Sequence, residues 1–438
     1  MESAGLVLFL IVIILILFGY PVGLTLGGIS VIAGLIFFDI DFFYLVSLRI
    51  FGIMNNFVLL AVPLFIFMGL TLEKSGIAEK LLETMAILFG KIRGGLAYSV
   101  IIVGGMLAAS TGIVGATVVT MGLISLPTML KRGYDKKIAT GVIASSGTLG
   151  QIIPPSVVLV LLGSVLNISV GDLFTSALLP GITLVFLYVI YVGIVSFIKP
   201  EMVPAMPEED IENFKKNTNT LDLIKTFILP FILIFSVLGS IFMGVASPTE
   251  AAGIGALGAL ILSYLEGGIN LKKIDTISID TMKLTSIVFM ILLGATSFSL
   301  VFRGLEGDKF IIDLIYASNL SPEMFTILVL LIVFIAGFFI DFIEIIFIIV
   351  PVITPILLAL NIDLLWIGIM LAINLQTSFL TPPFGFSLFY LKSVSPKEIK
   401  TTDIYKGIIP FVIIQIVFLI FLFFSPDYIY IIPDLLKN

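Results

Sequence analysis

Residues 145–155 read SSGTLGQIIPP, a polar run ending in two prolines that interrupts an apolar segment covering residues 138–166. A second proline pair, Pro382-Pro383, stands 228 positions later, inside the apolar segment 364–391. The same offset pairs other structure-breaking residues: Gly27 with Gly255, Gly76 with Gly304, Pro127 with Pro355 and Asp135 with Asp363. A common offset for Pro, Gly and Asp over more than 120 residues predicts two copies of one unit.

The composition is that of a protein embedded in a lipid bilayer. Hydrophobic residues make up 59% of the 438 residues, charged residues only 12%, and the mean hydropathy is +1.23. Soluble domains carry about 25% charged residues, so these values predict an all-α polytopic membrane protein. The absence of Cys and His excludes disulfides, thiolate chemistry, imidazole bases and most transition-metal sites. Residues 1–5 carry no basic side chain, so we expect no cleaved signal peptide.

Apolar stretches long enough to cross or enter a bilayer follow one another in both copies. In the first copy we predict segments at 4–20, 21–38, 54–72, 77–92, 95–130, 138–166 and 173–198. The second copy repeats the pattern at 223–244, 249–265, 284–302, 308–317, 324–359, 364–391 and 404–424. The proline-rich, charged segment 200–222 is predicted to be a cytoplasmic linker between a first repeat at 1–199 and a second at 223–438. The number of spans within 4–38 stays open.

Two of these segments are too long to be one regular helix. The blocks 95–130 and 324–359 each contain about 36 residues and are interrupted near the middle, by Ser110-Thr111-Gly112 and by residues 337–341. A re-entrant hairpin fits both, because non-helical backbone within the membrane is tolerated only where protein or a cavity surrounds it.

The distribution of basic residues gives an independent prediction of topology. If both blocks return to the face from which they entered, 19 of the 23 Lys and Arg lie on one face. The other face carries four: Arg49, Arg303, Lys309 and Lys437. Basic residues concentrate in cytoplasmic loops, so the richer face is predicted to be cytoplasmic. Each copy then has five crossings and the second copy is inverted, as in many secondary transporters.

Hydroxyl groups and interrupted helices are predicted to meet near the middle of the membrane. The first copy offers residues 109–112 and 145–151, and the second offers 337–341 and 374–381. We expect each proline pair to start a half-helix, because proline suits the first helical turn and a helix N-terminus attracts anions. Residues 138–198 contain no Lys or Arg, so peptide dipoles rather than cations would hold an anionic substrate there. The freed carbonyls and hydroxyls suit Na⁺.

Several of these residues also have structural interpretations. Small residues spaced by four, from Gly104 to Ala116, can serve helix packing alone, and the proline pairs can be simple kinks. Asp341 is predicted to coordinate an ion, although it can also N-cap the second arm of its hairpin. Glu344 is left open between a polar contact and a structural hydrogen bond. The run Ser247-Pro248-Thr249-Glu250 predicts a capping box that opens the span 249–265.

Five ordered motifs resemble the signatures of the large membrane (M) subunit of TRAP (tripartite ATP-independent periplasmic) transporters, DctM-like. They are AASTGIVGAT (108–117), GQIIPPS (150–156), ASPTEAAG (246–253), GFFID (337–341) and TPPFG (381–385). The resemblance implies an inverted-repeat elevator fold of the ion transporter superfamily and Na⁺-coupled uptake of organic acids (carboxylates). It implies no cofactor besides Na⁺ as the coupling ion. It further implies two partners, a small four-helix (Q) membrane subunit and a periplasmic substrate-binding (P) protein, and a place in the bacterial or archaeal cytoplasmic (inner) membrane.

The resemblance also implies where the ligands bind. For Na⁺ it implies Ser110, Thr111, Gly112, Ser145, Ser146, Gly147, Gly337, Asp341, Gln376, Thr377 and Thr381. For the substrate we expect Ser110, Thr111, Gly150, Pro154, Pro155, Thr381, Pro382 and Pro383, at the hairpin tips and helix breaks. The sequence departs from many family members at Glu344, where they carry an uncharged residue.

Two other functions are to be weighed against this one. A self-sufficient carboxylate or oxyanion carrier of related fold is the alternative, and neighbouring genes for a four-span protein and a secreted binding protein would argue against it. An intramembrane enzyme is a different class. Neither Gly171-Asp172 nor Gly307-Asp308 stands in a Gly-x-Gly-Asp pattern, so we expect no catalytic residues. The sequence leaves open the acid carried, the Na⁺ stoichiometry and the oligomeric state.

Overall fold

The chain folds into helices. The computed structural model describes residues 2–111, 114–209, 220–318 and 320–437, and within these ranges it contains no strand. Six helices are long and apolar enough to cross a bilayer, and a seventh span results if α17 (Phe342–Ile348) and α18 (Val350–Ala359), bent by 48°, count as one. Shorter apolar helices of 10–17 residues accompany them. The expected all-α polytopic class is confirmed.

The element order is as follows. The first half forms α1 (Glu2–Leu17), α2 (Val22–Phe37), α3 (Phe42–Met54), η1 (Phe57–Leu60), α4 (Ala61–Lys74), α5 (Ile77–Leu88), α6 (Gly95–Thr111), α7 (Val114–Lys131), α8 (Lys136–Thr148), η2 (Leu149–Gln151), α9 (Val157–Leu166), α10 (Val170–Ile198) and η3 (Pro200–Met202). The second half forms α12 (Thr220–Phe242), α13 (Pro248–Leu265), α14 (Leu271–Gly304), α15 (Gly307–Ala317), α16 (Pro322–Ala336), α17, α18, α19 (Leu364–Leu380), α20 (Phe386–Val394), α21 (Thr401–Phe424), η4 (Pro426–Tyr430) and α22 (Ile431–Lys437).

Some boundaries differ from those predicted. Helix α3 was not predicted, because its 13 residues form too short an apolar run to be recognised as a span. Helix α14 begins at Leu271 rather than near 284, and its first turns carry several charged side chains that hydropathy does not detect as helix. An ion pair between Lys74 and Asp280 ties these turns to α4. Residues 4–38 form two helices, separated at residues 18–21, and the chain folds again beyond 424 as η4 and α22.

The predicted capping box is present, and two further residues also cap helices. Ser247 and Glu250 form the capping box at the start of α13, with the Ser247 amide donating to Glu250 Oε2 over 2.8 Å. Asp135 and Asp363, which coincide at the offset of 228 residues, both serve as N-caps, of α8 and α19. Asp135 Oδ1 accepts from the Lys137 amide at 2.8 Å, and Asp363 Oδ1 accepts from the Leu365 amide at 2.7 Å. The two residues therefore have the same local role.

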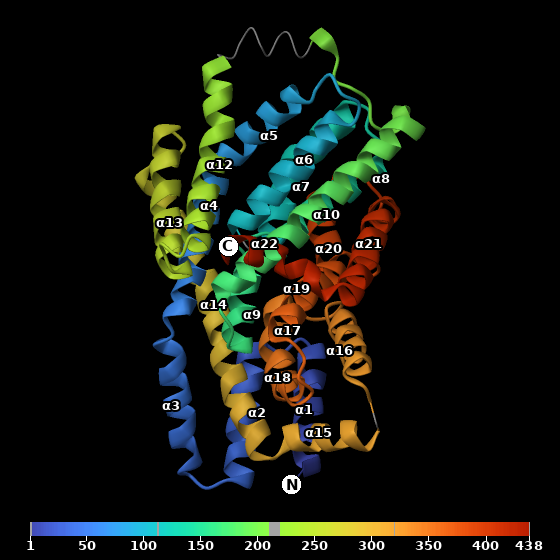
Figure 1. The fold of residues 1–438 in the computed structure, drawn as a ribbon. Coiled ribbons are helices and arrows are strands. Elements are labelled where there is room, and N and C mark those ends of the chain that lie inside the picture. The colour runs from blue at the N-terminus through green and yellow to red at the C-terminus, as the bar shows by residue number, and fades with distance from the viewer. Residues whose placement is uncertain (1, 112–113, 210–219, 319, 438) are drawn as a thin grey trace.

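The helices pack in two sets, which meet where α6 contacts α4 and α5 and where α17 contacts α14 and α9. In the first set, α14 packs on α2 and α4, and α13 packs on α4 and α12. In the second set, α8 packs on α6, α7 and α21, and α19 packs on α16, α20 and α21. Figure 1 shows an elongated molecule, with α5, α6 and α12 toward one end and α1, α3 and α15 toward the other. Helix α17 contacts α14 of the first set and α9, so residues of distant parts of the chain adjoin there.

Candidate functional site

Both helices that carry a proline pair are interrupted, as predicted. Helix α8 ends at Thr148, one turn of 3₁₀-helix follows, and α9 starts only at Val157. Helix α19 ends at Leu380 and α20 starts at Phe386. The peptide bonds Pro154-Pro155 and Pro382-Pro383 are both cis.

The position of the prolines corrects one expectation. They do not open the new half-helices: Val157 follows Pro155 by two residues, and Phe386 follows Pro383 by three. The residue before a proline is driven away from the helical region, so the first proline of each pair cannot be helical and the helix resumes further on.

In the first half of the chain, α6 and α7 are the two arms of the block 95–130, and both pack against the interrupted segment at the end of α8. A Cβ atom at Gly150 would overlap the backbone carbonyl of Ala108 in α6. Gly147 faces Val118 of α7, where an added Cβ would lie 2.5 Å from Cγ2. Only glycine permits this approach of the helix break to both arms. Of the other predicted residues, Gly112 lies outside the described residues, and the side chains of Ser110 and Thr111 are not described.

In the second half, the block 324–359 packs against the break after α19. Gly337 ends α16, and a Cβ atom there would overlap the Ser378 hydroxyl. The Asn374 amide donates to the Leu330 carbonyl over 2.7 Å, which joins α19 to α16. The rings of Phe342 and Phe379 lie 5.9 Å apart. Each interrupted helix thus adjoins the block of its own half.

Asp341 stands at the turn between the two arms and begins α17. Its Oδ1 accepts a hydrogen bond from the Phe342 amide at 2.6 Å. Glu344 Oε2 accepts from the Asp341 amide at 3.3 Å, so the two carboxylates form a capping box. The structural interpretation of Asp341 is confirmed, and Glu344 has the structural hydrogen bond. A carboxylate has about four acceptor positions, so the cap leaves capacity for an ion.

A central cavity of about 450 Å³ lies next to Asp341. It is lined by the first residues of α7 (Val114–Ala116), by Val157 at the start of α9, and by Phe379 and Tyr390 on either side of the second break. Helix α4 and the middle of α14 complete the wall. The cavity therefore joins the return arms of both blocks to both interrupted helices.

Most of the predicted ligands do not line this cavity. Of the predicted residues whose side chains are described, Asp341 alone lines it. Gly150, Pro154 and Pro155 are buried, whereas Pro382 and Pro383 are partly or largely exposed. The structure brings the predicted residues to the same two breaks without placing their side chains in one ligand sphere.

Four of the predicted hydroxyl ligands donate to carbonyls of their own helices, and three of the four are buried. Ser145, Ser146 and Thr377 are 0–1% exposed. They donate to the carbonyls of Val142, Ile143 and Ile373 respectively, over 3.1, 3.1 and 2.7 Å. Thr381 donates to the Thr377 carbonyl over 2.8 Å. Each hydroxyl oxygen keeps its lone pairs, which are the groups that a hard cation needs.

Two glutamines at the breaks lack well-formed hydrogen bonds. Gln151 and Gln376 are fully buried, and within the described ranges neither side-chain amide has a partner at regular hydrogen-bond geometry, although the Gln376 amide lies next to the Tyr188 hydroxyl. Buried amides are normally paired, so an amide without a well-formed hydrogen bond near each break is a candidate ligand-binding group. Sequence reasoning identified Gln376 but assigned no role to Gln151, although its place in the GQIIPPS motif was a usable signal. In the described part of the chain no group of three or more Asp and Glu is placed so that it could hold a metal ion, so carbonyls, hydroxyls and amides would supply most ligands.

Comparisons with known proteins give a consistent result. A family model described as "Tripartite ATP-independent periplasmic transporter, DctM component" matches residues 9–428. The C4-dicarboxylate TRAP transporter large permease protein DctM of Pseudomonas aeruginosa is 29% identical over 400 residues, 91% of each chain. The sialic acid TRAP transporter permease protein SiaT of Haemophilus influenzae is 28% identical over 99% of this chain and 69% of its own length. The ectoine TRAP transporter large permease protein TeaC of Halomonas elongata is 27% identical over 86% of each chain.

The fold has a counterpart among solved structures. The YdaH transporter of Alcanivorax borkumensis, whose crystal structure is described as having an unusual topology, superimposes with a TM-score of 0.65. The match covers 97% of this chain and 98% of that one, at 12% sequence identity. At this identity the likeness concerns the fold alone.

Proposed function

The chain belongs to the DctM family of tripartite ATP-independent periplasmic transporters, as a large permease subunit and not an enzyme, and from this we propose that it couples uptake of organic acids to sodium entry. The observation that carries the proposal is the arrangement around the central cavity. Two interrupted helices carry buried hydroxyls and two buried glutamines, and the cavity that Asp341 lines adjoins both helices. Such breaks in paired transmembrane segments are typical of sodium and substrate sites in secondary transporters.

The proposed cation is Na⁺, held where the breaks adjoin the two blocks. Oxygen ligands from Ser145, Thr377 and Thr381, with the Gln376 amide, supply neutral dipoles. Asp341 supplies the negative charge that balances the ion. Sodium binding at both breaks would order the residues around the cavity and complete the site for the acid.

The proposed substrate is a small organic acid. The names of the relatives include a C4-dicarboxylate and sialic acid, both carboxylic acids, together with ectoine. Residues 138–198 have no Lys or Arg, so helix N-termini and peptide N–H groups near the first break would bind the carboxylate.

The proposed working unit has three parts in a bacterial or archaeal cytoplasmic membrane. We infer a small four-helix membrane subunit and a periplasmic protein that delivers the acid. The second packing set, with α8, α19 and the two blocks, would move as one body past the first set in an elevator motion. This assignment follows the division of contacts in the fold.

Reconstitution tests the proposal. The chain, its small membrane subunit and its binding protein are placed in proteoliposomes, and uptake of the labelled acid is followed with Na⁺ or K⁺ outside. We expect uptake with Na⁺ only, and only when all three proteins are present. Uptake that proceeds equally in K⁺ would refute sodium coupling. Full uptake by the chain alone would favour the self-sufficient carrier.

A further inference from the structure

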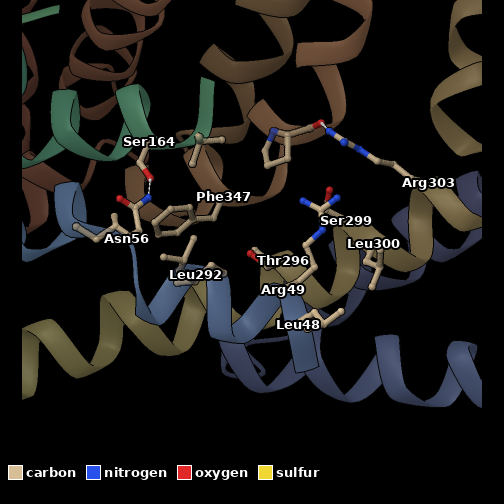
Figure 2. Close-up of a pocket in the computed structure, with 16 residues that line it drawn as sticks. Leu48, Arg49, Asn56, Ser164, Leu292, Thr296, Ser299, Leu300, Arg303 and Phe347 are labelled. Carbon is tan, nitrogen blue, oxygen red and sulfur yellow. Dashed lines mark hydrogen bonds between the residues drawn. The ribbon is translucent and has the colours of Figure 1, made fainter. Parts of the chain in front are cut away.

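A second cavity, of about 350 Å³, lies apart from the central one. Helices α3 and α14 form one wall, and α9, α17 and α18 form the other. A hydrogen bond of 3.3 Å from the Asn56 amide to the Ser164 hydroxyl joins the two walls. Figure 2 shows the side chains of Arg49 and Arg303 extending from α3 and α14 toward this space.

Helix α14 presents a polar face to this second cavity. Thr296, Ser299 and Arg303 are spaced by three and four residues, so they lie on one side of the helix. Arg49 of α3 lines the same cavity. The chain has only four arginines, and two of them meet here although 254 positions separate them.

The two arginines and the two hydroxyl groups that line the second cavity have few acceptors among the described residues. No Asp or Glu lines the cavity, and in the described ranges every ion pair is made by a lysine. Arg303 reaches only the Pro351 carbonyl, at 3.5 Å. The hydroxyls of Thr296 and Ser299 make no hydrogen bond to the described residues around them. Both arginines are exposed at the cavity. A guanidinium is always charged and offers five donors in a planar fork, so Arg49 and Arg303 keep most of their donors available for an anion.

We propose that the second cavity binds a carboxylate or phosphate group between Arg49 and Arg303, with Thr296 and Ser299 as additional donors. Arginine forks match the two oxygens of such groups, and an anion between two guanidinium groups removes their mutual repulsion. The proposal rests on the proposed function in one respect, since the carried organic acid is the carboxylate that we expect there. The phosphate of a lipid headgroup has the same chemistry.

The second cavity is linked to the central one through α17. Asp341 caps the first turn of this helix and lines the central cavity, whereas Phe347, near its other end, lines the second cavity. Six residues of helix correspond to about 9 Å. An anion in the second cavity would therefore lie one short helix away from the proposed sodium ligand.

Chemical protection of the arginines tests the proposal. The full-length chain is placed in nanodiscs of phosphatidylcholine and treated with phenylglyoxal, which modifies arginine. Mass spectrometry then follows the rate of modification at Arg49 and Arg303. Arg93, which is exposed and does not line the cavity, serves as an internal control. Succinate and inorganic phosphate are the soluble probes, and nanodiscs containing phosphatidylglycerol test a lipid headgroup.

We expect succinate or phosphate to slow modification of Arg49 and Arg303 together, at least about threefold, while Arg93 is unaffected. Arg303→Gln should raise the succinate concentration that half-protects Arg49 by about tenfold or more, as expected for losing a charge-assisted pair. Arg303→Lys should fall in between, because the charge remains and the fork is lost. Arg93→Gln is the matched control and should change nothing.

Each result decides the matter. Slower modification in phosphatidylglycerol discs without succinate supports the site and identifies a lipid phosphate as its occupant. No protection by any of the anions, or equal protection of Arg93, overturns the proposal. Unchanged protection of Arg49 in a folded Arg303→Gln variant overturns the joint site. Because the readout is chemical modification and not transport, failure here is distinct from failure of sodium coupling.

Discussion

Asp341 combines two roles that one pair of substitutions can separate. In the structure its carboxylate caps α17 by accepting from the Phe342 amide at 2.6 Å. In the proposed function the same carboxylate neutralises a bound sodium ion. Asparagine is about as good an N-cap as aspartate, whereas alanine caps poorly. Asp341→Asn therefore removes the charge and keeps the cap, and Asp341→Ala removes both.

The size of each effect can be worked out. Loss of the cap in Asp341→Ala should lower the free energy of unfolding by about 1 kcal/mol, and Asp341→Asn should leave it nearly unchanged. A carboxylate about 4 Å from an ion at an effective dielectric constant of about 20 contributes about 4 kcal/mol. Since about 1.4 kcal/mol is tenfold in affinity, both variants should weaken sodium binding between about 100-fold and 1,000-fold.

Two measurements check this. Thermal unfolding of the purified variants in detergent without sodium measures how much the N-cap at Asp341 stabilises the protein. The sodium concentration that gives half-maximal uptake in proteoliposomes, with the partner proteins present, reports the ion site. If Asp341→Asn has the sodium dependence of the unmodified chain, the carboxylate is not a ligand and the site assignment is wrong. If Asp341→Ala unfolds at the same temperature as the unmodified chain, the cap does not stabilise α17.

Three further outcomes are expected. Gln376→Leu removes a buried amide that has no well-formed hydrogen bond, so the sodium-free protein should not be destabilised. The variant should, however, no longer be stabilised by sodium in thermal unfolding. Stabilisation by sodium that persists in the variant would exclude Gln376 as a ligand. Gly150→Ala should lower the free energy of unfolding by about 1–3 kcal/mol, because the new methyl group overlaps the Ala108 carbonyl. Gly28→Ala is the control: no atom lies near the new methyl group, so the free energy of unfolding should change by no more than about 1 kcal/mol. Equal unfolding temperatures of the two variants would contradict the close packing at Gly150. Ser247→Ala should cost about 1 kcal/mol of stability and leave the sodium dependence of uptake intact, so a changed sodium dependence would show that this cap is more than structural.

The sequence alone was sufficient for local features. The proline pairs specify where two helices are interrupted, since a proline has no amide hydrogen and restricts the residue before it. Caps such as Ser247-Glu250 follow from side chains that bond to amides three residues away. The membrane class follows from the lengths of the apolar runs. Each of these depends on contacts within one turn or on bulk composition, which short stretches of chain encode.

Hydropathy was insufficient where helices are short or charged. Helix α3 has 13 residues, and the start of α14 carries Lys272, Lys273 and Asp280. The apolar run of α3 is too short to be recognised as a span, and the charged first turns of α14 are tied to α4 by the pair between Lys74 and Asp280.

Only the tertiary structure decided which distant side chains share a space. Nothing in the sequence places Arg49 beside Arg303, or leaves Gln151 without a partner. Those facts depend on how α3, α9, α14 and α17 pack, and helix packing is set by the summed fit of many side chains rather than by any motif. The chain thus encodes its breaks and caps locally, and its cavities arise from long-range packing.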